Sequence, residues 1–250
     1  MITVLCIAAS PRRHGNSSFL AQLAADAAVA ASPGEIDARV HSLAGAKIAP
    51  CRYCMRCKRL QGECSIADDF QELRDLWLQA DSIIYSAPVF HMGLPGQLRC
   101  FLDRLGQSLC FRFPECPQSP KLMKTIGAIA QGQHMAAGQE QSITAILHHA
   151  LIMGCIPVTG DAWECYIGAG GWTCDRSSPH ALEQLSAENE LGARAIVTAA
   201  ESLGRRAAEL TLFIQAGLAQ RIDISATQPT YERALQALDD DGSHRSRRGA

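Results

Sequence analysis

ITVLCIAASPRRHGNSS, residues 2–18, is the stretch that decides the fold. Its first seven residues are apolar and rich in β-branched side chains, a pattern typical of a strand covered on both faces. Residues 10–18 are polar and include Pro and Gly, so they form a loop. Asn16 and Ser17 are good N-cap residues, and apolar residues then recur at helical spacing until Ser32-Pro33-Gly34. The stretch predicts a strand, a loop and a helix.

The same alternation continues along the chain. Further strands are predicted over residues 36–43, 82–87, 122–130 and 156–159, with helical patterns between them. Five short strands alternating with helices indicate an α/β fold with a doubly wound, five-stranded parallel sheet. Residues 163–178 break the rhythm, and after Pro179 a long helical region is expected to run to about Gly217 and end near Arg221.

Length and composition favour one large domain. Of the 250 residues, 47% are apolar and 19% are charged, which excludes global disorder. We assign residues 1–221 to this domain and 222–250 to a charged C-terminal extension whose end is expected to be disordered. The net charge of −2 gives no reason to expect nucleic acid as a partner. No apolar run reaches the roughly 18 residues of a membrane helix, and residues 1–9 resemble a buried strand more than a signal peptide. A cytoplasmic location is therefore expected.

Loop 10–18 is a candidate anion site. In doubly wound sheets, ligands bind beyond the carboxyl ends of the strands, and the N-terminus of a helix favours anions. Ser10, Ser17 and Ser18 offer hydroxyls, and Arg12 or Arg13 can supply charge. The chain has no G-x-x-x-x-G-K-[ST] motif, and the loop has no G-x-G-x-x-G, so a nucleoside triphosphate and an ordinary dinucleotide site are disfavoured. The alternative is a plain polar loop with an N-cap.

Four of the eleven cysteines form a C-x2-C-x2-C-x6-C motif at Cys51, Cys54, Cys57 and Cys64. This spacing matches the ferredoxin-type run that wraps a [4Fe–4S] cluster, and the six-residue gap lets the fourth cysteine fold back onto the same cluster. Structural zinc usually shows two separated C-x2-C pairs or a Cys/His mixture, so zinc is the second interpretation and free thiols the third. Eleven cysteines in an unsecreted chain favour reduced thiols over disulfides. Cys6 and Cys155 are interpreted as small buried hydrophobes.

Three segments resemble one family. Loop 10–18 resembles the FMN-phosphate loop, S-P-R-x-x-G-N-[ST], of the NADPH-dependent FMN reductase branch of the flavodoxin-like proteins. Residues 88–104, PVFHMGLPGQLRCFLDR, resemble the flavin-ring segment of that family, and QGQ at 131–133 with GQE at 138–140 resembles its third flavin loop. Together with the cysteine motif, the pattern is that of the iron–sulfur flavoproteins over roughly residues 2–160.

The resemblance implies a flavodoxin-like fold with the cysteine-rich loop inserted, and FMN and a [4Fe–4S] cluster as cofactors. The implied cofactor-binding residues are Ser10, Arg12, Asn16, Ser17, Ser18, Pro88, Val89, Phe90, His91, Met92, Gly132 and Gln133, and the implied cluster ligands are Cys51, Cys54, Cys57 and Cys64. Val89, Phe90 and Met92 could supply the flat apolar wall that an isoalloxazine ring needs. His91 is the candidate proton donor during flavin reduction, with a solvent-facing side chain as the alternative. Asp103 and Arg104 are interpreted as a helix-end ion pair.

The function expected is an FMN- and [4Fe–4S]-dependent oxidoreductase that moves electrons between a small organic substrate or NAD(P)H, the flavin and the cluster. It could reduce quinones or other acceptors, or act as an FMN-dependent dehydrogenase of a biosynthetic intermediate. Two alternatives are a non-enzymatic electron carrier and a zinc-stapled, flavin-only quinone or FMN reductase.

The resemblance also bears on partners. In the family, flavin and cluster approach each other across subunits, which implies a homodimer or homotetramer. A small-molecule substrate and a redox partner such as ferredoxin are expected, whereas neither nucleic acid nor a membrane is. Segment 163–178 could cover the flavin and shape the substrate pocket.

Overall fold

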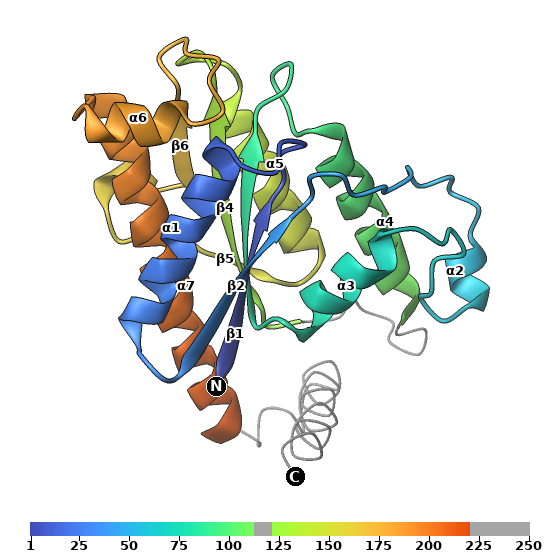
Figure 1. Cartoon of the computed structure of the whole chain (residues 1–250). Coiled ribbons are helices and arrows are strands. Elements are labelled where there is room, and N and C mark those ends of the chain that lie inside the picture. The colour runs from blue at the N-terminus through green and yellow to red at the C-terminus, as the bar shows by residue number, and fades with distance from the viewer. Residues whose placement is uncertain (113–121, 221–250) are drawn as a thin grey trace.

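A parallel sheet forms the centre of the molecule, in a computed structural model that describes residues 1–112 and 122–220 (Figure 1). The strands run in the order β2-β1-β3-β4-β5, and β6 also pairs with β4. Their bounds are β1 Ile2–Ala8, β2 Ile36–Ser42, β3 Ser82–Pro88, β4 Thr125–Gly132, β5 Ile156–Pro157 and β6 Ala169–Trp172. Strands β3 and β4 are buried along their whole length, and their sequences consist mostly of apolar and small residues, as expected for strands covered on both faces. The structure confirms the doubly wound, flavodoxin-like prediction.

Strand β6 is an additional strand beside the predicted five. Segment 163–178 showed no period, yet Ala169–Trp172 pairs in parallel with the carboxyl-terminal half of β4, while β5 pairs with the start of β4. The sequence of β6 is AGGW, which has little strand propensity. A Cβ at Gly171 would lie 2.4 Å from a side-chain atom of Ile196, so packing against a helix requires the glycine. Tertiary contacts, rather than local sequence, make this a strand.

Helices cover both faces of the sheet (Figure 1). One face is buried by α1 (Asn16–Ala31), α6 (Ala181–Ala187) and α7 (Leu191–Gln220). The other is buried by α3 (Phe70–Gln79), α4 (Gly96–Arg112) and α5 (Gln139–Ile152). The helical region predicted after Pro179 is therefore two helices, not one. Each face has its own apolar cluster, as a doubly wound sheet requires.

The cysteine loop leaves the carboxyl end of β2 and returns to α3. It contains one short helix, α2 (Arg56–Arg59), and lies beside α4, away from the sheet (Figure 1). A short 3-10 helix, η1 (Trp163–Cys165), precedes β6. No helix among the described residues is long and apolar enough to cross a membrane. The predicted extension 222–250 lies outside the described residues.

Candidate functional site

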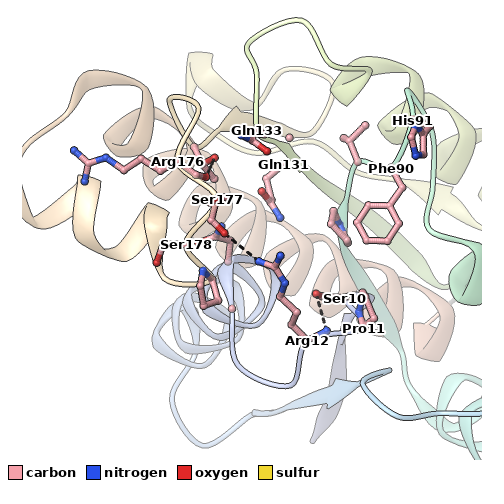
Figure 2. Close-up of a pocket in the computed structure, with 17 residues that line it drawn as sticks. Ser10, Pro11, Arg12, Phe90, His91, Gln131, Gln133, Arg176, Ser177 and Ser178 are labelled. Atoms are coloured by element: carbon pink, nitrogen blue, oxygen red, sulfur yellow. Dashed lines mark hydrogen bonds between the residues drawn. The ribbon is translucent and has the colours of Figure 1, made fainter.

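A cavity of about 440 Å³ opens at the carboxyl ends of β1, β3 and β4 (Figure 2). This volume is in the range of small-molecule and cofactor sites. Four segments line it, namely the loop after β1, the turn after β3, the end of β4 and the segment after β6. Parallel strands direct their following loops to one edge, so residues far apart in sequence meet there.

The cavity brings together most of the residues predicted to bind a cofactor. Its lining includes Ser10, Arg12, Asn16, Pro88, Val89, Phe90, His91, Gly132 and Gln133. Three predicted residues lie outside it. The Ser17 hydroxyl is buried and has no hydrogen-bond partner among the described residues, while Ser18 donates its hydroxyl to the Arg13 carbonyl. Met92 is 52% exposed beside the cavity.

The loop after β1 presents polar groups to the cavity. The Ser10 hydroxyl accepts a hydrogen bond from the Arg12 N–H at 3.1 Å. Arg12 points across the cavity and donates from Nη1 to the carbonyl of Ser177 at 3.3 Å (Figure 2). No carboxylate among the described residues pairs with Arg12, so its charge is available to an anion.

The predicted N-cap at Asn16 and Ser17 is wrong. Gly15 occupies the N-cap position of α1, and no side chain caps the helix. Asn16 instead uses its Oδ1 to accept the Leu182 N–H of α6. The first N–H groups of α1 thus lack a side-chain partner, and together with the buried Ser17 hydroxyl they fit an anionic group at this end of the helix.

The segment after β3 is a tight turn. The N–H and carbonyl of Phe90 bond to the carbonyl and N–H of Gly93 at 2.9 and 3.0 Å. His91 and Met92 between them have left-handed φ values of 47° and 68°, typical of a type I′ turn. The turn packs closely on Gly138, where a Cβ would lie 2.6 Å from Met92 Cα. Phe90 remains 46% exposed and presents an apolar ring at the cavity (Figure 2).

The fourth wall, residues 173–179, overlaps segment 163–178, for which the sequence suggests only that it could cover the flavin and shape the substrate pocket. Thr173 and Asp175 donate their N–H groups to the carbonyls of Gly132 and Gln133 at 3.0 Å, so the turn continues the β6–β4 pairing. Ser177 and Ser178 line the cavity. Arg176 extends away from the cavity (Figure 2). It forms a two-point ion pair with Glu188. In the sequence, Ser178-Pro179 before a helical pattern marks the start of a helix. No local feature of the sequence indicates that this segment lies beside the end of β4.

The four motif cysteines line a second, small pocket of about 20 Å³ beside α4. Cys57 is buried, Cys51 and Cys64 are half-buried and Cys54 is exposed. Hydrogen bonding to the backbone of Arg56 lowers the pKa of the Cys54 thiol, whereas burial raises that of Cys57. All four are free thiols, and left-handed φ values at Tyr53 and Met55 turn the loop around them.

The positions and the chemistry of these thiols bear on which metal group they could hold. Among residues 1–112 and 122–220, no three His, Cys, Asp or Glu side chains are gathered closely enough to hold a metal ion. A four-iron cluster separates its cysteine sulfurs more widely than a single tetrahedral ion does. Four cysteine thiols on one pocket match the donor set of a four-iron cluster.

Cysteines outside the motif behave differently. Cys6 and Cys155 are buried, as predicted, and burial raises the pKa of each to about 12. These thiols stay protonated and serve as small hydrophobes. Asp103 and Arg104 do not pair with each other, because Asp103 contacts Arg99 and Arg104 contacts Asp68.

Comparisons with known proteins give one matching family model and several similar sequences. The model of the family described as NADPH-dependent FMN reductase matches residues 2–164. An iron-sulfur flavoprotein of Archaeoglobus fulgidus is 30% identical over 172 residues, covering 69% of this chain and 83% of the relative. The iron-sulfur flavoprotein MJ1083 of Methanocaldococcus jannaschii is 34% identical over 158 residues, 63% of this chain and 76% of the relative.

Solved structures share the fold. RosB with a bound riboflavin-phosphate intermediate has a TM-score of 0.61 at 12% identity, covering 96% of this chain and 88% of RosB. A flavone reductase has a TM-score of 0.59 at 20% identity, covering 86% of this chain and 64% of the other chain, just under two thirds. Segment 173–179 lies beyond the part that the family model matches.

Proposed function

The chain belongs to the NADPH-dependent FMN reductase family, and on that premise we propose that it is an oxidoreductase that holds FMN in the 440 Å³ cavity and a [4Fe–4S] cluster on the cysteine loop. The observation that carries the proposal is the pairing of two sites in one chain. One is a cavity with an uncapped helix N-terminus and an arginine, Arg12, that pairs with no carboxylate of the described residues, and the other is a pocket lined by four free thiols. The named iron-sulfur flavoprotein relatives support the second site.

The first site would hold FMN by its phosphate and its ring. Ser10, Arg12 and the start of α1 would receive the phosphate, since they offer a hydroxyl, a positive charge and uncapped N–H groups. The Phe90 ring and the backbone of the turn that follows would flank the isoalloxazine. His91, at the same rim, is exposed and would donate a proton to the reacting flavin or acceptor.

When bound, FMN exchanges two electrons with a small organic molecule or NAD(P)H, and a cluster passes electrons singly to a partner. The cysteine loop begins at the carboxyl end of β2, on the same edge of the sheet as the cavity. An exposed basic and apolar surface surrounds the thiols, formed by Arg52, Tyr53, Met55 and Arg56. This surface suits contact with a second copy of the chain or with an acidic redox partner of the ferredoxin type.

Anaerobic purification with iron and sulfide reconstitution tests both sites. Wild type should bind one FMN and hold about four irons and four sulfides per chain, with broad absorbance near ~400 nm beside the flavin bands. NADPH, NADH and candidate quinones should then be tried as partners for the flavin. Zinc without sulfide would select a flavin-only reductase, and the absence of any metal would overturn the cluster half of the proposal.

A matched pair of variants assigns the cluster to the motif. Cys54→Ser removes the exposed motif thiol, and Cys110→Ser removes another exposed thiol, on α4 and outside the motif. Cys54→Ser should lose most of the iron and sulfide and keep FMN, while Cys110→Ser keeps both. Equal iron loss in the two variants would place the metal elsewhere.

A further inference from the structure

A buried arginine lies against the cysteine pocket. The Arg104 side chain is 1% exposed and lines the pocket from α4. Its Nη1 donates to both carboxylate oxygens of Asp68 at 2.7 Å, and the guanidinium stacks over the Phe70 ring at 4.2 Å. Burying a guanidinium costs free energy unless its charge is paired and its N–H groups are hydrogen-bonded. The burial of Arg104 therefore indicates a specific role at this position.

Arg104 and Asp68 together hold both ends of the cysteine loop. Ala49, ahead of the first cysteine, donates its N–H to Asp68 Oδ2 at 2.9 Å, and its carbonyl accepts from Arg104 Nη1 at 3.3 Å. Ile66, after the last cysteine, accepts from Arg104 Nη2 at 2.8 Å. The two side chains thereby close the base of loop 49–66 and offset the entropy of ordering it. The pair acts as a clamp.

The same guanidinium reaches a motif thiol. Arg104 Nη2 lies 3.4 Å from Cys64 Sγ and donates to it. Arg104 Nε is buried and has no hydrogen-bond partner among the described residues, which leaves one donor beside the pocket unused. Hydrogen bonds and positive charge next to a cysteinate ligand stabilise the reduced, more negative state of an iron–sulfur cluster.

We propose that Arg104 is a positioning residue of the iron–sulfur site: with Asp68 it clamps loop 49–66 in the metal-free chain, and through its hydrogen bond to Cys64 it raises the reduction potential of the bound cluster. The second part rests on the proposed function, whereas the clamp can be measured without a cluster.

The clamp is tested by hydrogen exchange on metal-free, FMN-loaded protein. Arg104→Gln removes the charge, Arg104→Lys keeps the charge but loses the planar fork, and Arg99→Gln is the matched control. Arg99 lies on the same helix, and its ion pair with Asp103 is exposed. We expect exchange over residues 49–66 to quicken about tenfold in Arg104→Gln, less in Arg104→Lys, and to be unchanged in Arg99→Gln. Should Arg104→Gln fail to fold, Arg104→Lys against Arg99→Gln decides. Unchanged exchange in every folded Arg104 variant would overturn the clamp.

The hydrogen bond is tested by the cluster's midpoint potential after reconstitution. Arg104→Gln should lower it by an amount equal to about a tenfold shift in the reduction equilibrium, 59 mV for one electron. The midpoint potential of Arg104→Lys should lie between those of Arg104→Gln and wild type, and that of Arg99→Gln should equal the wild-type value. If Arg104 had only a structural role, the potential of the intact cluster would be the same in Arg104→Gln and wild type. That result would overturn the proposed effect of the hydrogen bond on the potential. If wild type takes up no iron or sulfide, the cluster part is overturned with the proposed function, and the exchange data still decide the clamp.

Discussion

The Asn16 side chain accepts a hydrogen bond from the Leu182 N–H at 3.0 Å, which ties the first residue of α1 to the second residue of α6. The side-chain oxygen of Asn16 thus binds a helix far along the chain. Asn16 also lines the cavity, where its amide NH₂ can donate to a ligand. Backbone atoms of Pro179 lie against the neighbouring Gly15, where a Cβ would be 3.3 Å from the Pro179 carbonyl. The late segment is therefore part of the site's construction.

Two substitutions at Asn16 separate these roles. Asn16→Ala should lower the free energy of unfolding by about 1 kcal/mol, since the Leu182 N–H of α6 loses the side-chain oxygen that accepts its hydrogen bond. Asn16→Asp keeps an acceptor and should preserve stability, but its charge should repel a phosphate and weaken FMN binding by about tenfold or more. Denaturant unfolding of FMN-free protein and flavin fluorescence titration measure the two effects. Wild-type FMN affinity in Asn16→Asp would remove Asn16 from the phosphate site.

The contact between α1 and α7 depends on a glycine. A Cβ at Gly204 would lie 2.1 Å from the Ala24 carbonyl, so Gly204→Ala must push the helices apart and should destabilise the protein by about 2 kcal/mol. Gly217 on the same helix has nothing within 4 Å of an added Cβ, and Gly217→Ala should stabilise by about 0.5 kcal/mol through helix propensity. Urea midpoints of the two variants should move in opposite directions. Similar small shifts in both would show that the helices can adjust.

Features of the fold that depend on local sequence were predictable, and features that depend on contacts between distant residues were not. Strands such as β1 and the loop after it were predictable because apolar runs, turn residues and motifs are local. Strand β6 was not, since AGGW forms a strand only by pairing with β4 and packing under Ile196. The partners of Asn16 and Arg104 lie 166 and 36 residues away, so the capping and ion-pair assignments failed for the same reason.

The ion pair between Asp161 and Arg205 gives a pH-dependent contribution to stability. Hydrogen bonding from Arg205 lowers the pKa of the Asp161 carboxyl below its ordinary 3.8. Because this pKa is lower in the folded state, the contribution is present above 3.8 and is lost as the pH falls through the folded value. Both side chains are about 40% exposed, so screening limits the pair to about 0.5 kcal/mol.

Asp161→Asn should therefore be less stable than wild type at pH 7 and approach wild type near pH 3. Chemical denaturation across this range, with Arg205→Gln and the double variant, isolates the pair's coupling energy. A difference of the same size at pH 3 would assign the effect to the Ser202 contacts of the 161–162 backbone instead.

Substitutions at Arg12 and Arg13 distinguish binding of the FMN phosphate from binding of the flavin ring. Arg12 lines the cavity, and no carboxylate among residues 1–112 and 122–220 pairs with it, whereas the neighbouring Arg13 is exposed and outside the lining. The FMN phosphate carries nearly two negative charges at neutral pH. Arg12→Gln should weaken FMN binding by about 2 kcal/mol, roughly thirtyfold, and Arg13→Gln should change it by less than about 0.5 kcal/mol.

Riboflavin, which has the same ring and no phosphate, is the internal control for this pair. Its affinity should be the same in wild type, Arg12→Gln and Arg13→Gln, and added salt should weaken FMN binding more in wild type than in Arg12→Gln. Fluorescence titrations of both flavins at two salt concentrations give all of these values. If Arg12→Gln lost equal affinity for riboflavin and FMN, the guanidinium would contact the ring and not the phosphate. If Arg12→Gln and Arg13→Gln lost equal affinity for FMN, Arg12 would act only through the positive charge of the loop and not through a specific contact.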